Sequence, residues 1–367
     1  MNILIITNHL NIGGITSYCL TLAAGLRKKG HKVYFASSGG NALERFLQAG
    51  IEFVAIPMKT KKEINPRILF CAGILSKLVK EKDIQIVHTH SRTTQVLGAI
   101  LARRTKATHI FTCHGFFKPR FLRRMFPCWG TKIIAISEQV KRHLVDDFKV
   151  DEQKIQVIHN GIDIDKFKDQ GSNIKNISKT KLGLGDGPVV GIIARLSDVK
   201  GHAYLIKAMK KVLERLPRAQ LLIAGEGKEK EALVSLAKNL AIEKNVFFIT
   251  EALDTRELLG VMDLFVMPSI KEGLGLALME AMAFGVPVIG SDVGGIKTLI
   301  RDGVSGLLVA VANSDGLANA IISLLGDPVK AQGYAKEARR FISENFSQEK
   351  MVLETEKEYL ECLSAAE

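Results

Sequence analysis

The sequence predicts an α/β protein with two doubly wound parallel sheets, one in each half of the chain. Three observations support this prediction. Short β-rich runs alternate with amphipathic helical runs, and the alternation comes in two series separated by a polar stretch. In addition, 367 residues with 47% apolar content are enough for two hydrophobic cores.

The first series occupies residues 1–167, which we assign to an N-terminal domain. Runs of branched and aromatic residues predict seven strands, and the amphipathic runs between them, such as 14–29 and 67–80, predict helices. The predicted strands are residues 3–7, 32–36, 51–56, 84–88, 108–112, 132–136 and 155–158.

A polar, charged and glycine-containing stretch, 163–188, separates the two series, and we place the domain boundary within it at residue 168. The second series, 168–346, predicts five strands separated by helices, with further helical segments from 315 to 345. The strands are residues 189–194, 220–224, 246–249, 264–267 and 286–290. A charged amphipathic helix is predicted at 348–363.

Cysteine usage and hydropathy predict a cytoplasmic protein. The five cysteines are odd in number and widely spaced, and none forms C-x-x-C, which favours unpaired thiols in a reducing compartment. No uncharged apolar run reaches the roughly 18 residues that a transmembrane helix needs. The first six residues lack the basic start and the cleavage site of a signal peptide.

The net charge of +13 is concentrated in the first half of the chain. Residues 1–170 hold 27 Lys and Arg against 13 Asp and Glu, a net of +14, and the remainder has a net of −1. Such asymmetry predicts an acidic partner, which is nucleic acid, a membrane surface or a phosphorylated acceptor. The chain has no helix-turn-helix, zinc-finger or RNA-recognition signature, so we expect no nucleic-acid partner.

The stretch 268–283 is the starting point for the functional prediction. An apolar strand turns through Pro268, Ser269 and two glycines into a helix-forming run, a geometry that presents backbone N–H groups to an anion. Glu272 and Glu280 frame this turn. Carboxylates repel a phosphate but accept hydrogen bonds from sugar hydroxyls, so the arrangement predicts a nucleotide-sugar ligand.

This stretch resembles the retaining glycosyltransferases of family 4. Glu272 and Glu280 match the E-x7-E motif of that family, and three later segments continue the resemblance, namely 285–288, 291–295 and 303–309. The resemblance implies the GT-B fold, in which two Rossmann-like doubly wound domains face each other across a cleft. It also implies that the last helix, about 347–367, crosses back to the first domain.

The resemblance implies a role for each residue of the donor site in the second domain. Arg195 and Lys200 neutralise the departing diphosphate, as a fixed guanidinium and an ammonium can do without a metal. Glu272 accepts hydrogen bonds from the sugar hydroxyls and Glu280 from the ribose. Backbone groups of the glycine loop bind the phosphates, and a second loop lies near the nucleotide. The glycine loop comprises Gly273, Leu274 and Gly275, and the second loop comprises Gly225 and Glu226.

Three positions of the first domain match the family as well. Gly13 and Gly14 follow the first strand, where small residues let a ligand approach the backbone, with Gly14 on the donor side and Gly13 on the acceptor side. His114 ends a strand and matches a His-Gly pair near the transferred sugar. Asn160 belongs to an N-G-x-D segment on the acceptor side. Glu251 departs from the family, which often has glycine there, so the choice between UDP and GDP stays open.

We expect no metal and no other cofactor. Asp163 and Asp165 spell D-x-D, which holds a divalent cation in another transferase fold class. We reject that use because the segment lies at the domain junction and cationic side chains already face the phosphate. His88 and His90 share one face of a strand, but no further metal ligand follows nearby in the sequence.

The function predicted by these residues is transfer of a hexose from a UDP- or GDP-sugar to a glycan or lipid-linked acceptor, with retention at the anomeric carbon. We expect it to serve cell-envelope polysaccharide or lipopolysaccharide synthesis. No carboxylate nucleophile is evident, so the resemblance favours a same-face mechanism. The alternatives are a nucleotide-sugar epimerase, a pyridoxal-dependent phosphorylase, which needs a longer chain and a Schiff-base lysine, and a basic nucleic-acid-binding protein.

Basic and aromatic residues interleave between positions 116 and 129. Arg120, Arg123 and Arg124 lie among aromatic residues that end with Trp129, a pattern that suits a membrane interface. We therefore expect reversible docking on the anionic inner face of a membrane. The alternative is that the aromatic rings pack into the core of the first domain and the arginines are solvated.

Overall fold

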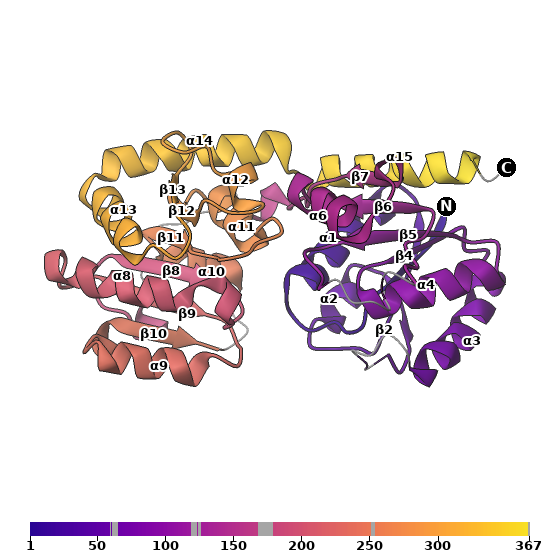
Figure 1. Ribbon diagram of the computed structural model, residues 1–367, viewed down its shortest axis with the longest axis horizontal. Coiled ribbons are helices and arrows are strands. Elements are labelled where there is room, and N and C mark those ends of the chain that lie inside the picture. Colours follow the sequence, from indigo (N-terminus) through magenta and orange to yellow (C-terminus); the bar gives the residue numbers. More distant parts are fainter. Residues whose placement is uncertain are drawn as a thin grey trace. The chain divides into compact units, whose positions relative to one another are not determined.

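The computed structural model describes residues 1–58, 60, 65–118, 123, 126–167, 179–250 and 254–365. The chain divides into two compact units, of which the first comprises Met1–Ile162 with Phe346–Glu367 and the second Asp163–Asn345. Each unit is a parallel sheet covered by helices (Figure 1). The predicted α/β class with two doubly wound sheets is therefore confirmed. Arg120, Arg124 and Glu251 lie outside the described residues.

The sheet of the first unit has seven parallel strands, and all seven correspond to predicted strands. Its order changes direction beside β1, which pairs with β2 on one side and β4 on the other. Across the sheet the strands are β3 (Glu52–Ala55), β2 (Lys32–Ser37), β1 (Asn2–Ile6), β4 (Ile86–Thr89), β5 (Thr108–Cys113), β6 (Lys132–Ala135) and β7 (Ile155–Val157).

Both faces of this sheet are apolar because successive side chains of a strand point to opposite sides. In β1, Ile3 and Ile5 pack in one core and Leu4 and Ile6 in the other. The first core is covered by α1 (Gly14–Lys28), α2 (Leu43–Gln48) and α15 (Gln348–Ser364). The second is covered by α3 (Pro66–Glu81) and α4 (Arg92–Arg104). A further helix, α6 (Glu138–Phe148), follows β6.

The last helix belongs to the first unit. The chain leaves α14 (Pro328–Asn345) and begins α15 after Ser347, whose side chain accepts a hydrogen bond from the Lys350 amide. Backbone hydrogen bonds join Ile162 to Phe346 and Gln348. The Gln348 side chain then donates to the carbonyl oxygen of Thr21 on α1 at 2.9 Å.

The sheet of the second unit has six parallel strands in an equivalent order. Five were predicted, and β13 is the addition. Across the sheet the strands are β10 (Val246–Ile249), β9 (Gln220–Ala224), β8 (Val189–Ile193), β11 (Leu264–Met267), β12 (Val288–Ser291) and β13 (Leu307–Val309). One core is formed with α8 (His202–Arg215), α9 (Lys230–Asn239) and α13 (Ser314–Gly326). The remaining helices are α10 (Thr255–Val261), α11 (Leu276–Phe284), α12 (Ile296–Leu299) and α14.

Candidate active site

The loops after β8 and β11 lie at the point where the strand order of the second sheet reverses. Ligands of doubly wound sheets bind outside the carboxyl ends of the strands at this place. The first loop carries Arg195 and Lys200, and the second carries Glu272. The winding of the sheet thus brings together residues separated by more than 70 positions in the sequence.

Backbone contacts hold the two loops against each other. The Ile270 amide donates to the carbonyl oxygen of Val199 at 2.8 Å. Gly201 ends the short 3-10 turn Asp198–Lys200 with φ of +74°, and a Cβ there would overlap the carbonyl oxygen of Pro268. Only glycine meets both requirements, so the position of Lys200 depends on Gly201.

Lys200 and Glu272 form an ion pair within this site. The Lys200 Nζ lies 2.5 Å from Glu272 Oε2, and the two side chains are 21% and 12% exposed. The Ser269 hydroxyl donates to the same oxygen at 3.4 Å, and the Gly273 amide donates to Oε1 at 3.2 Å. The sequence predicts that the lysine binds phosphate and the carboxylate binds sugar, and the structure shows that the two side chains also pair with each other.

The glycine loop leads directly into α11. Gly273, Leu274 and Gly275 are buried, and no side chain of the described residues caps the N-terminus of α11. The carbonyl oxygen of Glu272 accepts from the Gly295 amide of the loop after β12 at 3.1 Å. The structure therefore adds the loop after β12 to the site, and it leaves the amides at the start of α11 available to an anion.

Glu280 lies in the second turn of α11 and is mostly buried. Burial raises the pKa of its carboxyl to about 7, with a further increase from the charge of Asp254 and a smaller decrease from Lys166. Both neighbours belong to the second unit. The carboxyl is thus held near its midpoint at neutral pH, because the charge of Lys166 offsets only part of the effect of burial.

The loop after β9 contributes the remaining predicted residues of the second unit. The Leu196 amide donates to the carbonyl oxygen of Glu226 at 2.8 Å, which places Gly225 and Glu226 beside the loop that carries Arg195. Arg195 is exposed and has no ion pair within the described part of the chain. Its guanidinium is therefore free to take an anionic partner.

His202 is a site residue that the sequence interpretation missed. It begins α8, directly after Gly201, and is only 2% exposed. Burial lowers the pKa of its imidazole to about 4, and the charge of Lys200 lowers it further. A neutral ring at this position adds no positive charge beside Lys200. The sequence signal that could have identified His202 is its position directly after Lys200 and Gly201.

Three histidines of the first unit form a buried chain that ends at His114. The His90 Nδ1 lies 3.1 Å from His114 Nε2, and the His88 and His90 rings are 4.1 Å apart. His88 Nδ1 contacts the Tyr359 hydroxyl of α15 at 2.6 Å, and its Nε2 contacts the Thr112 hydroxyl at 2.7 Å. Burial lowers the pKa of His114 to about 3 and keeps the pKa of His88 and His90 well below 6.5.

This chain indicates which nitrogen of His114 carries the proton. His90 Nε2 is buried and has no hydrogen-bond partner among the described residues. An unpaired buried acceptor is more readily tolerated than an unpaired buried N–H. We therefore assign the proton of His90 to Nδ1, from which it donates to His114 Nε2. His114 then carries its own proton on Nδ1 and presents a hydrogen-bond donor.

The other predicted residues of the first unit lie at the start of α1 and in the loop after β7. Gly13 and Gly14 are at the N-terminus of α1, and a Cβ on Gly14 would meet nothing within 4 Å. Packing therefore does not require glycine at position 14. Asn160 is 6% exposed, and its Oδ1 has no hydrogen-bond partner in the described part of the chain.

Two family models match the chain. The model named Glycosyltransferase Family 4 covers residues 12–166, and the model named Glycosyl transferases group 1 covers residues 174–341. Each match falls almost wholly within one structural unit. The chain belongs to the family 4 glycosyltransferases.

Curated relatives of this glycosyltransferase match over most of their length. The chain is 27% identical to an uncharacterized glycosyltransferase, MJ1607 of Methanocaldococcus jannaschii, over 94% of this chain and 93% of the relative. It is 28% identical to N-acetyl-alpha-D-glucosaminyl L-malate synthase of Bacillus anthracis, over 98% of this chain and 96% of the relative. It is 29% identical to UDP-Gal:alpha-D-GlcNAc-diphosphoundecaprenol alpha-1,3-galactosyltransferase of Escherichia coli, over 70% of each chain.

Solved structures share the GT-B fold of this glycosyltransferase. Anabaena Alr3699/HepE in complex with UDP-glucose matches with a TM-score of 0.86 and 22% identity, covering 100% of both chains. A glycosyltransferase from Rickettsia africae matches with a TM-score of 0.85 and 24% identity, covering 99% of this chain and 98% of the other. At these identities the likeness concerns the fold.

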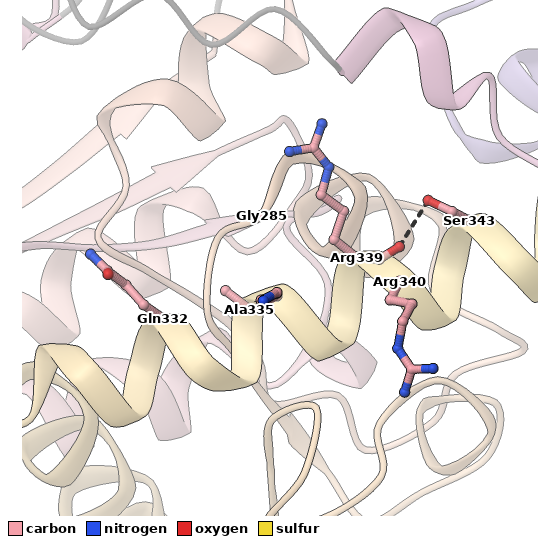
Figure 2. A pocket seen from close by; sticks show the side chains of 7 residues that line it. Gly285, Gln332, Ala335, Arg339, Arg340 and Ser343 are labelled. Carbon is pink, nitrogen blue, oxygen red and sulfur yellow. Dashed lines mark hydrogen bonds between the residues drawn. The ribbon is translucent and has the colours of Figure 1, made fainter.

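A surface hollow of about 420 Å³ in the second unit of the glycosyltransferase lies apart from the predicted site. Its lining residues come from α14, with Gly285 from the end of α11. Figure 2 shows the guanidinium groups of Arg339 and Arg340 extending to opposite sides of α14, so they do not converge on one anion. Arg340 also pairs with Glu337 at 2.6 Å. We therefore place the active site at the strand ends and not in this hollow.

The predicted membrane segment of the glycosyltransferase packs partly into the first unit. Trp129 lies against Phe111 and Phe148, and the buried Arg92 stacks over its ring. Arg123 lies over the Phe117 ring and donates to the carbonyl oxygen of Lys118. The contacts of Trp129 therefore support the alternative interpretation, in which the aromatic rings of this segment pack into the first unit. None of the described helices has the length and apolar character to span a membrane.

Proposed function

We propose that this glycosyltransferase moves a hexose from a UDP-sugar to a glycan or lipid-linked acceptor, with retention at the anomeric carbon. The observation that carries the proposal is the Lys200–Glu272 pair at the reversal point of the second sheet, next to Arg195, which has no ion pair among the described residues. This arrangement offers cations to a diphosphate and a carboxylate to sugar hydroxyls in one place.

The diphosphate is bound by fixed cations in this proposal. Arg195 and Lys200 approach it from the loop after β8, and the amides at the start of α11 approach it from the other side. As the glycosidic bond breaks, negative charge grows on the leaving phosphate, and preorganised donors stabilise that charge in the transition state. We propose that no metal is required, and EDTA treatment tests this.

The sugar and the ribose are bound by separate carboxyl groups. Glu272 accepts hydrogen bonds from the hydroxyls of the transferred sugar, and Glu280 accepts them from the ribose. His114, protonated on Nδ1, donates a hydrogen bond to the sugar. Gly14 admits the donor phosphate close to the backbone of the first unit, and Gly13 and Asn160 bind the acceptor.

The reaction proceeds on one face of the sugar. Glu272 is already engaged by Lys200, Ser269 and Gly273, so it is held for hydrogen bonding rather than for nucleophilic attack. The leaving phosphate takes the proton of the acceptor hydroxyl while that hydroxyl attacks the anomeric carbon. Departure and attack on the same face retain the anomeric configuration.

The choice of UDP and of a lipid-linked acceptor rests on relatives. HepE is described in complex with UDP-glucose, and the E. coli relative is named for UDP-Gal and a diphosphoundecaprenol acceptor. We propose the same donor class here, and a place in cell-envelope glycan synthesis at the cytoplasmic face of a membrane. A nucleotide-sugar epimerase remains the competing GT-B activity, and it would need no acceptor.

Two measurements test the proposal. A ligand that binds only the folded protein at 100 times its Kd raises stability by about 2.7 kcal/mol, or roughly 5–10 °C in a domain of this size. UDP is therefore expected to shift the melting temperature where GDP and ADP do not. NMR of the product then reports the anomeric configuration. Equal shifts with every nucleotide, or an inverted product, would overturn the respective part of the proposal.

A further inference from the structure

Helix α3 exposes an apolar outer face. Its inner face is buried against the first sheet through residues such as Ile68, Cys71 and Leu75. On the outer face, Leu69 is 56% exposed, Phe70 62% and Ile74 38%. Single exposed apolar residues are ordinary on a protein surface, but these three lie within one and a half turns of a helix and form one patch.

The charges of α3 determine what can cover this patch. The helix carries Arg67, Lys77 and Lys80 against the single carboxylate of Glu81. The whole first half of the chain, residues 1–170, has a net charge of +14. Cations around exposed apolar side chains are complementary to a surface with anionic groups above an apolar interior.

Helix α15 provides an internal comparison. It also exposes apolar side chains, with Leu353 58% and Leu360 53% exposed. However, α15 carries five glutamates and two lysines, so an anionic surface would repel it. These two helices of the same unit therefore both expose apolar side chains but differ in the sign of the surrounding charge. Of the two, α3 is the one that suits an anionic membrane.

We propose that α3 docks this glycosyltransferase reversibly on an anionic membrane. Phe70, Leu69 and Ile74 enter the headgroup region, and the cations of the helix contact lipid phosphates. Lys77 lies 3.7 Å from Glu81, so Arg67 and Lys80 are the cations of α3 that have no ion pair among the described residues. Two cations contribute roughly thirtyfold to partitioning, which is enough for reversible docking and too little for permanent anchoring. The inference deepens the proposed function by naming the surface that brings the enzyme to a lipid-linked acceptor.

Co-sedimentation with vesicles tests α3 directly. The full chain is mixed with phosphatidylcholine vesicles with and without phosphatidylglycerol, at low and high salt. The wild type is expected to bind the anionic vesicles, and binding should weaken as salt screens the charges. The double variant Phe70→Glu and Ile74→Glu should bind at least about tenfold less. The control, Leu353→Glu with Leu360→Glu, makes the same change in charge on α15 and should bind like the wild type.

Three outcomes would overturn the proposal. They are equal binding of the α3 variant and the wild type, equal loss in the α15 control, and equal binding to neutral and anionic vesicles. A dimer in solution that dissociates in the α3 variant would assign the patch to a second copy instead. Both variants change exposed positions, and a normal melting transition shows that they fold. The UDP-induced shift in the same samples tests the proposed function separately, because the nucleotide site belongs to the second unit.

Discussion

Replacing Glu280 with Gln is expected to stabilise the protein above pH 7 and to leave its stability at pH 4.5 nearly unchanged. The folded protein holds the pKa of Glu280 at about 7 instead of 4.5, mainly because the side chain is buried. Well below pH 4.5 the carboxyl is neutral in both the folded and the unfolded chain, and at pH 4.5 the difference between the two states is still small. Between pH 4.5 and 7 the unfolded chain loses this proton first, so wild-type stability falls as the pH rises.

The size of the effect follows from the same pKa. At about 1.36 kcal/mol per pKa unit, a rise from 4.5 to about 7 corresponds to a penalty of at most about 3 kcal/mol, fully present above pH 7. Gln is neutral at every pH and avoids it. In a domain of this size the variant should melt up to roughly 6–12 °C above the wild type at pH 8.

Thermal melts of both proteins from pH 4.5 to 8.5 measure this difference. Glu231→Gln, which changes an exposed carboxylate on α9, is the matched control and should show no such dependence. UDP adds a second measurement, because in the proposed function ribose hydroxyls donate hydrogen bonds to the ionised carboxylate of Glu280. Wild-type affinity for UDP should rise from pH 6 to 8, while the variant should bind UDP weakly at every pH. A stability difference that does not change with pH would refute the reasoning.

Four further predictions concern the site. Arg195→Ala and Lys200→Ala should each lower turnover by roughly a hundredfold or more. The control variant Lys238→Ala, at an exposed position of α9, should not. Unchanged turnover in both site variants would exclude Arg195 and Lys200 from the mechanism. Activity should survive EDTA treatment. A loss of activity that Mg²⁺ or Mn²⁺ restores would instead support the hypothesis that Asp163 and Asp165 hold a divalent cation. Glu272→Gln should spare UDP binding and weaken binding of the full donor, which calorimetry with both ligands measures. His90→Phe should lower turnover about tenfold with UDP binding intact, and ¹⁵N shifts of the wild type should show His114 protonated on Nδ1. Protonation on Nε2 would contradict that assignment.

The strands of the fold were predictable from the sequence except for β13. Hydrophobic runs located seven strands of the first sheet and five of the second. β13 and β7 are both only three residues long, but β7 belongs to a run rich in β-branched residues, whereas two of the three residues of β13 are leucines, which form helices as readily as strands. β13 is a strand because Ile289 and Ser291 of β12 pair with it, and such pairing is a property of the folded chain. The break between α13 and α14, by contrast, falls at Pro328, a common first residue of a helix.

The sequence supplied the candidate site residues one by one, but it could not supply the contacts between them. The family motif identified His114, and alternation along a strand placed His88 and His90 on one face. The partner of His88 is Tyr359, which lies 271 residues further along the chain on α15. Nothing local in the sequence relates these two positions, because the contact arises only when α15 packs on the first unit. The orientation of His114 therefore depends on a helix that the motif does not contain.

The Lys200–Glu272 pair explains how opposite charges are kept in the site before a donor arrives. A half-buried ammonium or carboxylate without a partner loses hydration that nothing replaces. The Lys200 ammonium and the Glu272 carboxylate are 2.5 Å apart, so each neutralises the charge of the other and replaces part of its lost hydration. In the function that we propose, a nucleotide-sugar then supplies phosphate oxygens to the lysine and hydroxyl donors to the carboxylate. Because an ammonium has three N–H donors, Lys200 can bind phosphate while it still holds Glu272. Donor binding thus extends an existing charge network and does not have to create two buried charges.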